Sequence, residues 1–275
     1  MTNYGDRTVV ITGAGGAIGS ALARRFARER ARIVLIDNSE ERLKTLRDVL
    51  HSCGSCPLVL PADIAQPDAC TSAIDRALME FGSIDILINN AGITQFGLCE
   101  HTRTDVYRSI FDVNFFGSVN CTIAALPALI ASKGAIGVIS SIAGFAPLLG
   151  RAGYCASKHA LHGYFDTLRC EVRRHGIYVT LICPGFTESD LEKRALAADG
   201  SISVAGRTQV GATASPDDVA DAAYAAITAR RRIVVLSSIG KISRLIRTCA
   251  PSLYDRVMTN RLKAEFDRDS QRQKP

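Results

Sequence analysis

Seven short apolar runs recur along the chain, and a longer stretch separates each from the next. The runs are rich in β-branched residues and continuously apolar, which is typical of strands buried on both faces. They occupy residues 8–12, 32–37, 57–61, 84–89, 135–141, 178–183 and 232–237. Intervening segments such as GSALARRFARER and AIDRALMEFG carry apolar residues at helical spacing. This order predicts an α/β fold, a doubly wound, mostly parallel seven-stranded sheet of Rossmann type, with ligands at the carboxyl ends of the strands.

Two segments depart from this alternation. Residues 186–214 are polar, spaced by glycines and weakly patterned, and they follow the sixth predicted strand. We interpret them as a mobile lid over the substrate. Beyond the last predicted strand, apolar residues return at helical spacing, which predicts two short amphipathic helices. The chain thus divides into a single domain, residues 1–239, and a C-terminal helical extension, residues 240–275.

Composition limits the class of protein. With 275 residues, 47% of them hydrophobic, the chain can bury a sizeable core. No apolar run approaches the ~18 residues of a spanning helix, and the N-terminus lacks a signal-peptide core, so we expect a cytoplasmic protein. The nine cysteines are scattered and odd in number, which favours free thiols. Cys53 and Cys56 form a lone CxxC without further ligands, so we expect no metal site.

Positive charge is concentrated in the C-terminal extension. The net charge is +6, and from Arg230 onward twelve Lys and Arg residues stand against four Asp and Glu. A solvated face is the commoner origin of such a bias, but a basic amphipathic tail can also rest on an anionic membrane. We expect no nucleic-acid partner, and peripheral membrane contact stays open beside packing of the tail on the protein itself.

The stretch TGAGGAIG at residues 12–19 follows the first predicted strand and opens a predicted helix. In that context glycines predict a dinucleotide site: Gly13 permits a tight turn, residues 15–17 let backbone amides approach a pyrophosphate, and Gly19 lets the helix pack closely on the sheet. The spacing TGxxGxxG is complete at Gly13, Gly16 and Gly19, whereas TGxxxGxG has Ala17 in place of its second glycine.

Asp37 ends the second predicted strand, eighteen residues after Gly19. There a carboxylate can accept hydrogen bonds from the adenosine ribose and repel a 2′-phosphate. The same residue could instead cap the following helix. No Lys or Arg stands in the glycine turn or directly after Asp37, so we expect NAD in preference to NADP, and oxidation of an alcohol as the direction in the cell.

Three residues suit proton transfer to or from a substrate oxygen. Tyr154 and Lys158 are four apart in a predicted helix and share a face, and Ser141 ends the fifth predicted strand. Hydride transfer between a carbinol carbon and nicotinamide needs a group that takes or supplies the hydroxyl proton. A free phenol has a pKa near 10, and we expect the Lys158 ammonium, with help from the positive nicotinamide ring, to lower the pKa of Tyr154. Ser141 can hold the substrate oxygen near Tyr154.

An ordered set of motifs accompanies these residues. NNAG at residues 89–92, Asn114, Ser141, Tyr154, Lys158 and PG at residues 184–185 occur in that order. With them, from about Thr8 to Leu236, the chain resembles the short-chain dehydrogenase/reductase family. The resemblance implies that Tyr154 is the general acid/base, that Lys158 also binds the nicotinamide ribose and that Asn114 anchors a proton-relay water. It further implies a homodimer or homotetramer, an adenine contact at Asp63, and a structural as well as functional role for Asn90. The implied cofactor site comprises Gly13, Gly15, Gly16, Ala17, Ile18, Gly19, Asp37, Asp63, Ile64, Asn90, Ala91, Gly92, Tyr154, Lys158, Pro184 and Gly185.

The same resemblance decides between the two glycine spacings. TGxxGxxG is typical of extended relatives with a large C-terminal substrate domain. Fewer than fifty residues separate Pro184 from the last predicted strand, too few for such a domain. We therefore interpret Ala17 as a replacement of the second glycine in TGxxxGxG, and expect Ala17→Gly to leave NAD binding largely intact.

The substrate is less defined by the sequence. IAGFAPLLG at residues 142–150 and Phe186 can form an apolar wall, which suits a lipophilic alcohol or ketone of steroid, retinoid, aromatic or fatty type. Equally, these residues can pack a loop on the core. His159 and His162 are expected to be packing or surface groups. Two alternatives stay open: an NADP(H)-dependent carbonyl reductase, and a non-catalytic NAD-binding regulator or scaffold.

Overall fold

A computed structural model describes residues 5–188, 191–203 and 213–260. Seven parallel strands form one sheet in the order β3-β2-β1-β4-β5-β6-β7, which confirms the predicted fold class. The strands are β1 Thr8–Thr12, β2 Arg32–Asp37, β3 Leu58–Pro61, β4 Ile86–Asn89, β5 Ala135–Ile139, β6 Tyr178–Cys183 and β7 Ile233–Val235. The order reverses between β1 and β4, so the carboxyl ends of these two strands form the crevice in which this type of sheet binds ligands.

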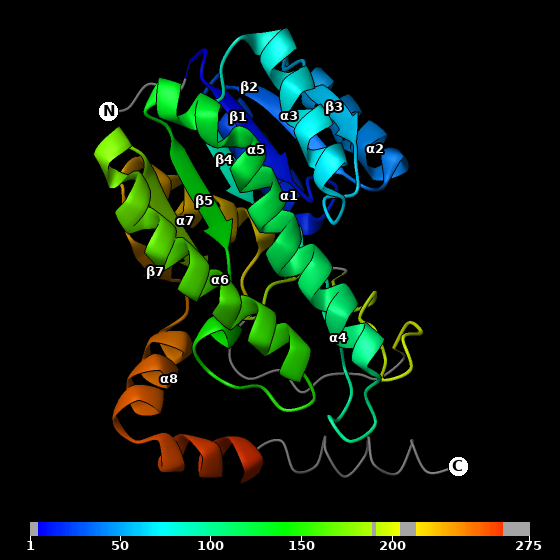
Figure 1. The fold of residues 1–275 in the computed structure, drawn as a ribbon, viewed down its shortest axis with the longest axis vertical. Coiled ribbons are helices and arrows are strands. Elements are labelled where there is room, and N and C mark those ends of the chain that lie inside the picture. Colours follow the sequence, from blue (N-terminus) through cyan, green and yellow to red (C-terminus); the bar gives the residue numbers. More distant parts are fainter. Residues whose placement is uncertain (1–4, 189–190, 204–212, 261–275) are drawn as a thin grey trace.

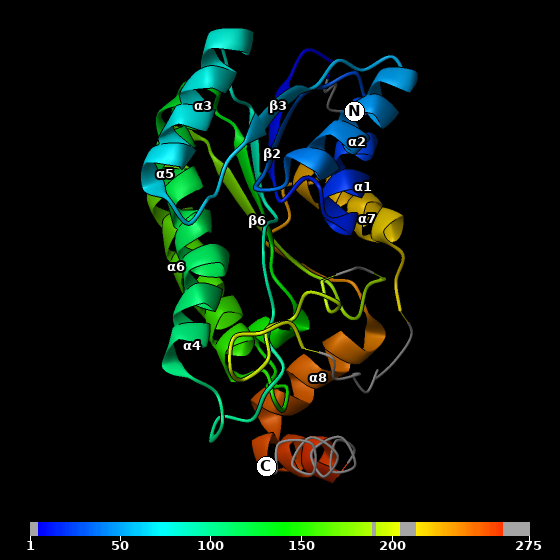
Figure 2. The same cartoon turned by 90° about the vertical axis from the view of Figure 1, so that its right-hand side faces the viewer.

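Helices cover both faces of the sheet (Figures 1 and 2). One layer holds α1 Ala17–Ala27, α2 Glu40–Ser52 and α7 Pro216–Thr228, and the other holds α3 Pro67–Phe81, α5 Gly117–Ser132 and α6 Ala152–Val172. Along β1, Val10 faces the core under α3, α5 and α6, whereas Val9 and Ile11 face the core under α1, α2 and α7. Successive strand residues point to opposite faces, so a continuously apolar strand supplies both cores.

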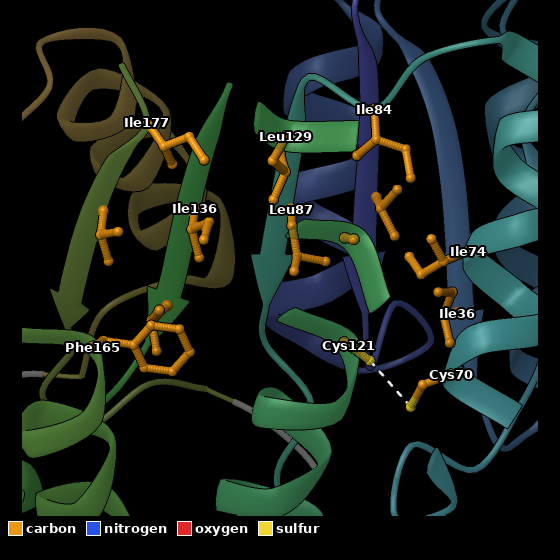
Figure 3. Packing of buried hydrophobic residues seen from close by; sticks show 14 of the residues in the cluster. Ile36, Cys70, Ile74, Ile84, Leu87, Cys121, Leu129, Ile136, Phe165 and Ile177 are labelled. Carbon is orange, nitrogen blue, oxygen red and sulfur yellow. Dashed lines mark hydrogen bonds between the residues drawn. The ribbon is translucent and has the colours of Figure 1, made fainter. Parts of the chain in front are cut away.

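The core beneath α3, α5 and α6 is made mostly of aliphatic side chains, together with Phe165 and with two thiols at one end (Figure 3). Cys70 on α3 and Cys121 on α5 are both buried, and their sulfur atoms lie 3.5 Å apart. All nine cysteines are free thiols. Both thiols therefore serve as small apolar packing groups in the structure.

A long helical rod carries α5 toward the ligand end of the sheet. It begins as α4 Thr104–Phe111, passes through a π-helical turn, η1 Asp112–Phe116, and continues as α5. Residues Thr104–Ser132 are together long and apolar enough to cross a membrane by length and composition alone. In the structure, apolar residues of this stretch form part of the protein core, because Cys121, Ala125 and Leu129 pack on the sheet.

Beyond β7 the chain forms an amphipathic helix, α8 Ser238–Cys249, which begins two residues before the predicted boundary at 240, and residues 251–260 are also helical. Both stretches lie beyond the carboxyl ends of the strands (Figures 1 and 2). Tyr254 is buried, and its hydroxyl donates to the carbonyl of Pro147 at 3.3 Å. The tail therefore closes over part of the loop that was expected to line the substrate site.

The segment interpreted as a lid is partly docked. Residue Leu196 pairs with Gln95 in the loop after β4, and Phe96 donates its amide to the carbonyl of Leu196 at 2.8 Å. Arg103 donates its amide to the carbonyl of Ala198 at 2.9 Å. Residues 189–190 and 204–212 lie outside the described residues. The predicted mobility of the segment stays a prediction, but its described part has defined partners.

Candidate active site

One cavity of about 230 Å³ runs along the carboxyl ends of the strands, from Asp37 at one end to Tyr154 and the segment after β6 at the other. It is bordered by most of the residues predicted to bind cofactor or substrate. Those residues are Gly13, Gly16, Ala17, Ile18, Gly19, Asp37, Asp63, Ile64, Asn90, Ala91, Gly92, Ser141, Tyr154, Lys158, Pro184 and Gly185.

The glycine turn after β1 leaves no room for side chains at two of its positions. Gly13 has a φ of +63°, and a Cβ there would lie 2.6 Å from the Cα of Ala91. A Cβ on Gly19 would lie 2.2 Å from the carbonyl oxygen of Gly13. Gly16 is less restricted, since its Cβ would meet that oxygen at 3.3 Å. The close approaches at Gly13 and Gly19, rather than the glycine at 16, therefore hold this turn against the sheet.

Helix α1 begins at Ala17 and points its N-terminus into the cavity. Its cap residue, Gly16, supplies no side-chain hydrogen bond to the first turn, and Ala17 and Ile18 line the cavity. Backbone amides at such an uncapped end favour an anion, through both their hydrogen bonds and the helix dipole. The residues present therefore fit the pyrophosphate of a dinucleotide, and the methyl of Ala17 is accommodated at this end.

The NNAG motif ties β4 to the glycine turn. Asn90 donates from Nδ2 to the carbonyls of Thr12 at 2.9 Å and Gly13 at 3.0 Å. In return, the Thr12 hydroxyl accepts from the backbone amides of Asn90 and Ala91. These bonds join the two central strands where the crevice opens, so Asn90 shapes the site as well as bordering it.

Asp37 is the most tightly held carboxylate at this end of the cavity. Its oxygens accept from the amides of Gly15 at 3.0 Å and Ser39 at 2.9 Å, and from Nη2 of Arg42 at 3.0 Å. The cap of α2 is Ser39, not Asp37, which removes the capping alternative. Gly15 is held closely here, because a Cβ on it would lie 2.7 Å from Cβ of Arg42.

Arg42 corrects the expectation that no cation stands near Asp37. It is five residues further along the chain, but α2 begins at Glu40, and its first turn carries Arg42 back over the carboxylate. Arg42 also borders the cavity. The sequence signal that could have placed Arg42 near Asp37 was a helix start at Glu40 with Ser39 as its cap, because such a start puts residue 42 in the first helical turn after the strand.

The loop after β3 borders the same end of the cavity. Asp63 is exposed and accepts the amide of Ala65 at 3.0 Å. The carbonyl of Ile64 accepts from Nδ2 of Asn120 at 3.1 Å and from the thiol of Cys70 at 3.3 Å. The resemblance places the adenine here, and the geometry shows that α3 and α5 together hold Ile64 in place.

Ser141 and Tyr154 meet at the other end of the cavity. Strand β5 ends at Ile139, two residues before the predicted end, because Ser140 and Ser141 turn out of the sheet. Ser141 caps a short helix, η2 Ile142–Gly144, by accepting from the amide of Ala143 at 3.1 Å. Its hydroxyl lies close enough to the phenol of Tyr154 to influence the pKa of that phenol, and both residues are buried.

The pKa of Tyr154 is raised in the structure, and its expected lowering by Lys158 together with the nicotinamide ring stays a prediction. Burial is the largest influence and raises the pKa of Tyr154 above its usual value, while Ser141 acts in the opposite direction. Lys158 lies with Nζ 5.7 Å from the centre of the Tyr154 ring. It donates to the carbonyl of Ile139 at 2.9 Å, and burial lowers its pKa to about 8. The phenol is therefore protonated at neutral pH.

Asn114 lies in the π-helical turn η1 and is completely buried. Its Oδ1 accepts from the amide of Ile93 at 2.8 Å, and its Nδ2 donates to the carbonyl of Ile93 and to the hydroxyl of Ser157. The side chain therefore fastens the loop after β4 to helix α6. The implied role in holding a water stays a prediction.

The substrate end has a mixed lining. Ile142, Leu148 and Phe186 border it, as the expected apolar wall requires. Charged residues border it as well, which the sequence argument missed: Arg151, Glu192 and Arg194. Arg151 is three residues before Tyr154, and its place next to the proposed acid/base was the signal available in the sequence.

His162 packs behind the site rather than in it. Its Nε2 lies 2.9 Å from the hydroxyl of Ser140 and 3.8 Å from the thiol of Cys183. Burial lowers its pKa to about 4, so it is neutral at physiological pH. This agrees with the expected packing role.

Comparison with known proteins identifies relatives. Residues 7–200 match the family model described as short chain dehydrogenase. The chain is 38% identical over 268 residues to dehydrogenase/reductase SDR family member 7B of Bos taurus, covering 94% of this chain and 82% of the relative. It is 36% identical over 262 residues to dehydrogenase/reductase SDR family protein 7-like of Anopheles gambiae, covering 93% and 83%.

Solved structures share the fold. A short chain dehydrogenase/reductase from Burkholderia phymatum, solved in complex with NAD, superimposes with a TM-score of 0.82 at 24% identity, covering 92% of this chain and 96% of that one. A short chain dehydrogenase from Mycobacterium paratuberculosis, bound to NAD, gives 0.75 at 23% identity, covering 86% and 97%.

Proposed function

The chain belongs to the short chain dehydrogenase family, and from that premise we propose that it is an NAD(H)-dependent oxidoreductase that interconverts a secondary alcohol and a ketone. The observation that carries the proposal is the buried pair of Ser141 and Tyr154, which borders the same cavity as Lys158 and the glycine turn.

The proposed chemistry assigns one task to each polar group. In ketone reduction the phenol of Tyr154 donates its proton to the carbonyl oxygen, and Ser141 hydrogen-bonds the same oxygen. The raised pKa of Tyr154 suits this role, because the phenol keeps its proton until the substrate needs it. In alcohol oxidation the phenol must lose that proton first, and the ammonium of Lys158 then stabilises the phenolate.

The cofactor would lie along the cavity between Asp37 and Tyr154. Asp37 would accept from the ribose hydroxyls of the adenosine, the N-terminus of α1 would hold the pyrophosphate, and Lys158 would bind the second ribose. When bound, the nicotinamide supplies the hydride acceptor or donor that no side chain provides. The structural relatives crystallised with NAD support this assignment.

Arg42 favours a second candidate, an NADP(H)-dependent carbonyl reductase. The guanidinium lies 3.0 Å from Asp37 and borders the cavity at the ribose end. A guanidinium there can bind a 2′-phosphate by donating hydrogen bonds to it, whereas Asp37 alone would repel the phosphate. The protonated phenol of Tyr154 fits the reductive direction as well.

The decisive test of catalysis is Tyr154→Phe. This change removes the hydroxyl and keeps the ring, so we expect turnover of secondary alcohols or ketones to fall by about 10²-fold or more while cofactor affinity stays within a few-fold. Turnover is measured by NADH or NADPH absorbance and affinity by fluorescence titration. Undiminished cellular activity of the variant would favour the non-catalytic regulator instead.

The remaining assignments concern the whole protein in the cell. We propose a lipophilic substrate, supported by Ile142, Leu148 and Phe186 at the substrate end. A homodimer or homotetramer is supported by the exposed Phe116 and Ile123 on the rod of α4, η1 and α5. A cytoplasmic protein with a peripheral membrane contact is supported by α8, whose exposed side includes apolar and basic residues.

A further inference from the structure

The substrate end of the cavity holds an ion pair that the proposed chemistry does not use. Arg151, the cap residue of α6, donates from Nη2 to Oε1 of Glu192 at 3.2 Å. The side chains are 11% and 24% exposed, and both border the cavity. An ion pair withdrawn from water carries a desolvation cost that its attraction offsets only in part. Its position beside the reacting groups suggests a use other than stability.

Arg151 has donors to spare. A guanidinium carries five N–H donors in a planar fork. Within the described part of the chain, Glu192 is the only acceptor that the Arg151 guanidinium reaches. The Cζ of Arg151 lies 5.7 Å from the centre of the Phe96 ring. The other donors therefore have no protein acceptor among the described residues, and the side chain borders the cavity. Such a group can bind a carboxylate or a phosphate with two parallel hydrogen bonds.

The surroundings favour an anion with an apolar remainder. Among the described residues that border this end of the cavity, Arg151, Arg194 and Lys158 are basic and Glu192 is acidic, so the cations outnumber the carboxylate there. The other side chains there include Ile142, Leu148 and Leu191. Positive charge among apolar walls attracts a negatively charged ligand and excludes water from it.

We propose that Arg151 is the anion-binding residue of the substrate site, and that the substrate is a ketone or secondary alcohol with a carboxylate or phosphate group and an apolar chain. Glu192 neutralises Arg151 until the anion of the substrate replaces it. Because Arg151 is three residues before Tyr154, the bound anion lies on the side of the cavity where the carbonyl oxygen is protonated. This inference rests on the proposed oxidoreductase function.

The test compares substrates that differ in charge. NADH and NADPH consumption is measured with 4-oxodecanoate, its methyl ester and the phosphate monoester of 1-hydroxydecan-2-one. We expect an anionic substrate to have a kcat/KM about tenfold or more above that of the ester. Arg151→Gln should remove this preference through KM, and the better of the two anions identifies the group that is recognised. The control is Arg47→Gln, because the side chain of Arg47 on α2 is 41% exposed and, among the described residues, pairs with the neighbouring Asp48.

Two results would overturn the inference while leaving the oxidoreductase function intact. One is equal use of the acid, the phosphate and the ester by the unmodified protein. The other is an equal loss with all three in Arg151→Gln, as expected if Arg151 only positions the segment that carries Glu192.

A binding measurement separates this inference from the proposed function, because it needs no turnover. By calorimetry we expect decanoate to bind the unmodified protein about tenfold or more tightly than decan-1-ol does, and Arg151→Gln to remove the difference. If no carbonyl compound is turned over with either cofactor, the proposed function fails, and this titration still decides the anion site. If the variant does not fold, equal binding of the two ligands to the unmodified protein overturns the inference.

Discussion

Asp37 and Arg42 form a charge pair at the end of the cavity where the adenosine ribose would bind. The carboxylate favours a free 2′-hydroxyl, and the guanidinium favours a 2′-phosphate. Because Asp37 is also held by the amides of Gly15 and Ser39, it is fixed in place. The side chain of Arg42 is 33% exposed and can turn toward a ligand. The cofactor preference therefore depends on which of the two charged groups contacts the ribose.

Two substitutions at this pair should change cofactor preference in opposite directions. We expect Arg42→Ser to lower kcat/KM for NADP(H) by about 10–100-fold with a small effect on NAD(H), because a charge-assisted hydrogen bond to phosphate is lost. Asp37→Ser should raise the use of NADP(H) relative to NAD(H). Initial rates with the four cofactors measure both. An unchanged ratio in Arg42→Ser would show that the guanidinium serves only to hold Asp37.

His162 should make the protein less stable in mild acid. Its pKa is about 4 in the folded protein against 6.5 in an unfolded chain, so below pH 6.5 the unfolded chain binds a proton that the folded protein refuses. The stabilisation that results from the lowered pKa of His162 is fully present above pH 6.5 and is lost as the pH falls toward 4. The surrounding groups are Ser140, Cys183 and Phe145 in contact, with charges from Asp166, His159, Arg244 and Lys158.

The measurement is the free energy of unfolding in urea at pH 7 and pH 5. His162 should account for a loss of about 2 kcal/mol between these values. His162→Gln keeps a hydrogen-bonding side chain near Ser140 and cannot be protonated, so its loss over this range should be smaller by that amount. The same pH dependence in protein and variant would assign the acid sensitivity to other groups.

At the scale of elements, the junction of β1 and α1 depends on the absence of one side chain. A Cβ on Gly19 would meet the Gly13 carbonyl at 2.2 Å, the Cα of Ala14 at 2.8 Å and Nδ2 of Asn90 at 2.8 Å. We expect Gly19→Ala to lower the free energy of unfolding by about 1–3 kcal/mol, because the backbone of α1 must move away from the sheet. The same movement should weaken NAD binding markedly.

Ala17→Gly is the matched control at the same junction. Ala17 is the first residue of α1 and borders the cavity, so removal of its methyl should leave NAD affinity within a few-fold and cost at most about 1 kcal/mol. Urea unfolding and fluorescence titration with NADH measure both variants. A loss of affinity in Ala17→Gly as large as that in Gly19→Ala would contradict the assignment of the close contact to Gly19.

The elements themselves could be predicted because the inner strands are buried on both faces, while the edge strands β3 and β7 are partly buried but still apolar. Such strands are continuously apolar, and their order along the chain determines a parallel, doubly wound sheet. The errors lie at strand ends: β5 stops at Ile139 and β7 spans only Ile233–Val235, because the residues beyond leave the sheet to form the site and the start of α8. An apolar pattern indicates which residues are buried. Burial continues beyond the last residue that hydrogen-bonds to a neighbouring strand, so the pattern predicts strands that are too long.

The site could be predicted where its residues have fixed spacing. Ser141, Tyr154, Lys158 and the glycine turn follow strand ends or share a helix face, so the fold brings them together. Arg42 and Glu192 could not be placed in the same way. The position of Arg42 depends on where α2 begins, for which the Ser39 cap was the available signal. The position of Glu192 depends on how the segment after β6 returns over the cavity, which no local pattern predicts.

For the molecule as a whole, the exposed side of α8 is its least explained surface. Ile239, Ile242 and Leu245 recur at helical spacing and are 39%, 56% and 65% exposed. The opposite side of the helix is the one that packs, since Gly240 is buried against Ile142 and Val235. An apolar stripe on an exposed helix suits a boundary between water and lipid.

The charges beside this stripe suit the surface of an anionic bilayer. Lys241, Arg244 and Arg247 are exposed on α8. Near an anionic surface each cation contributes about 1 kcal/mol to binding, and the attraction falls with added salt. Burial of the apolar residues in the lipid boundary adds to this, so we propose that the full chain binds anionic vesicles better than neutral ones.

Sedimentation with phosphatidylserine-containing and pure phosphatidylcholine vesicles tests this proposal. Ile242→Ser combined with Leu245→Ser should weaken binding to the phosphatidylserine-containing vesicles with little loss of stability, because both side chains are exposed. Truncation is a poorer test, since Tyr254 packs on Pro147 and its loss would open the wall of the substrate site. Met79→Ser, at a 76% exposed position on α3, controls for loss of an exposed apolar group. Equal partitioning of the unmodified protein onto both lipids would exclude electrostatic docking. The exposed apolar residues of α8 would then be assigned to contacts with protein instead of lipid.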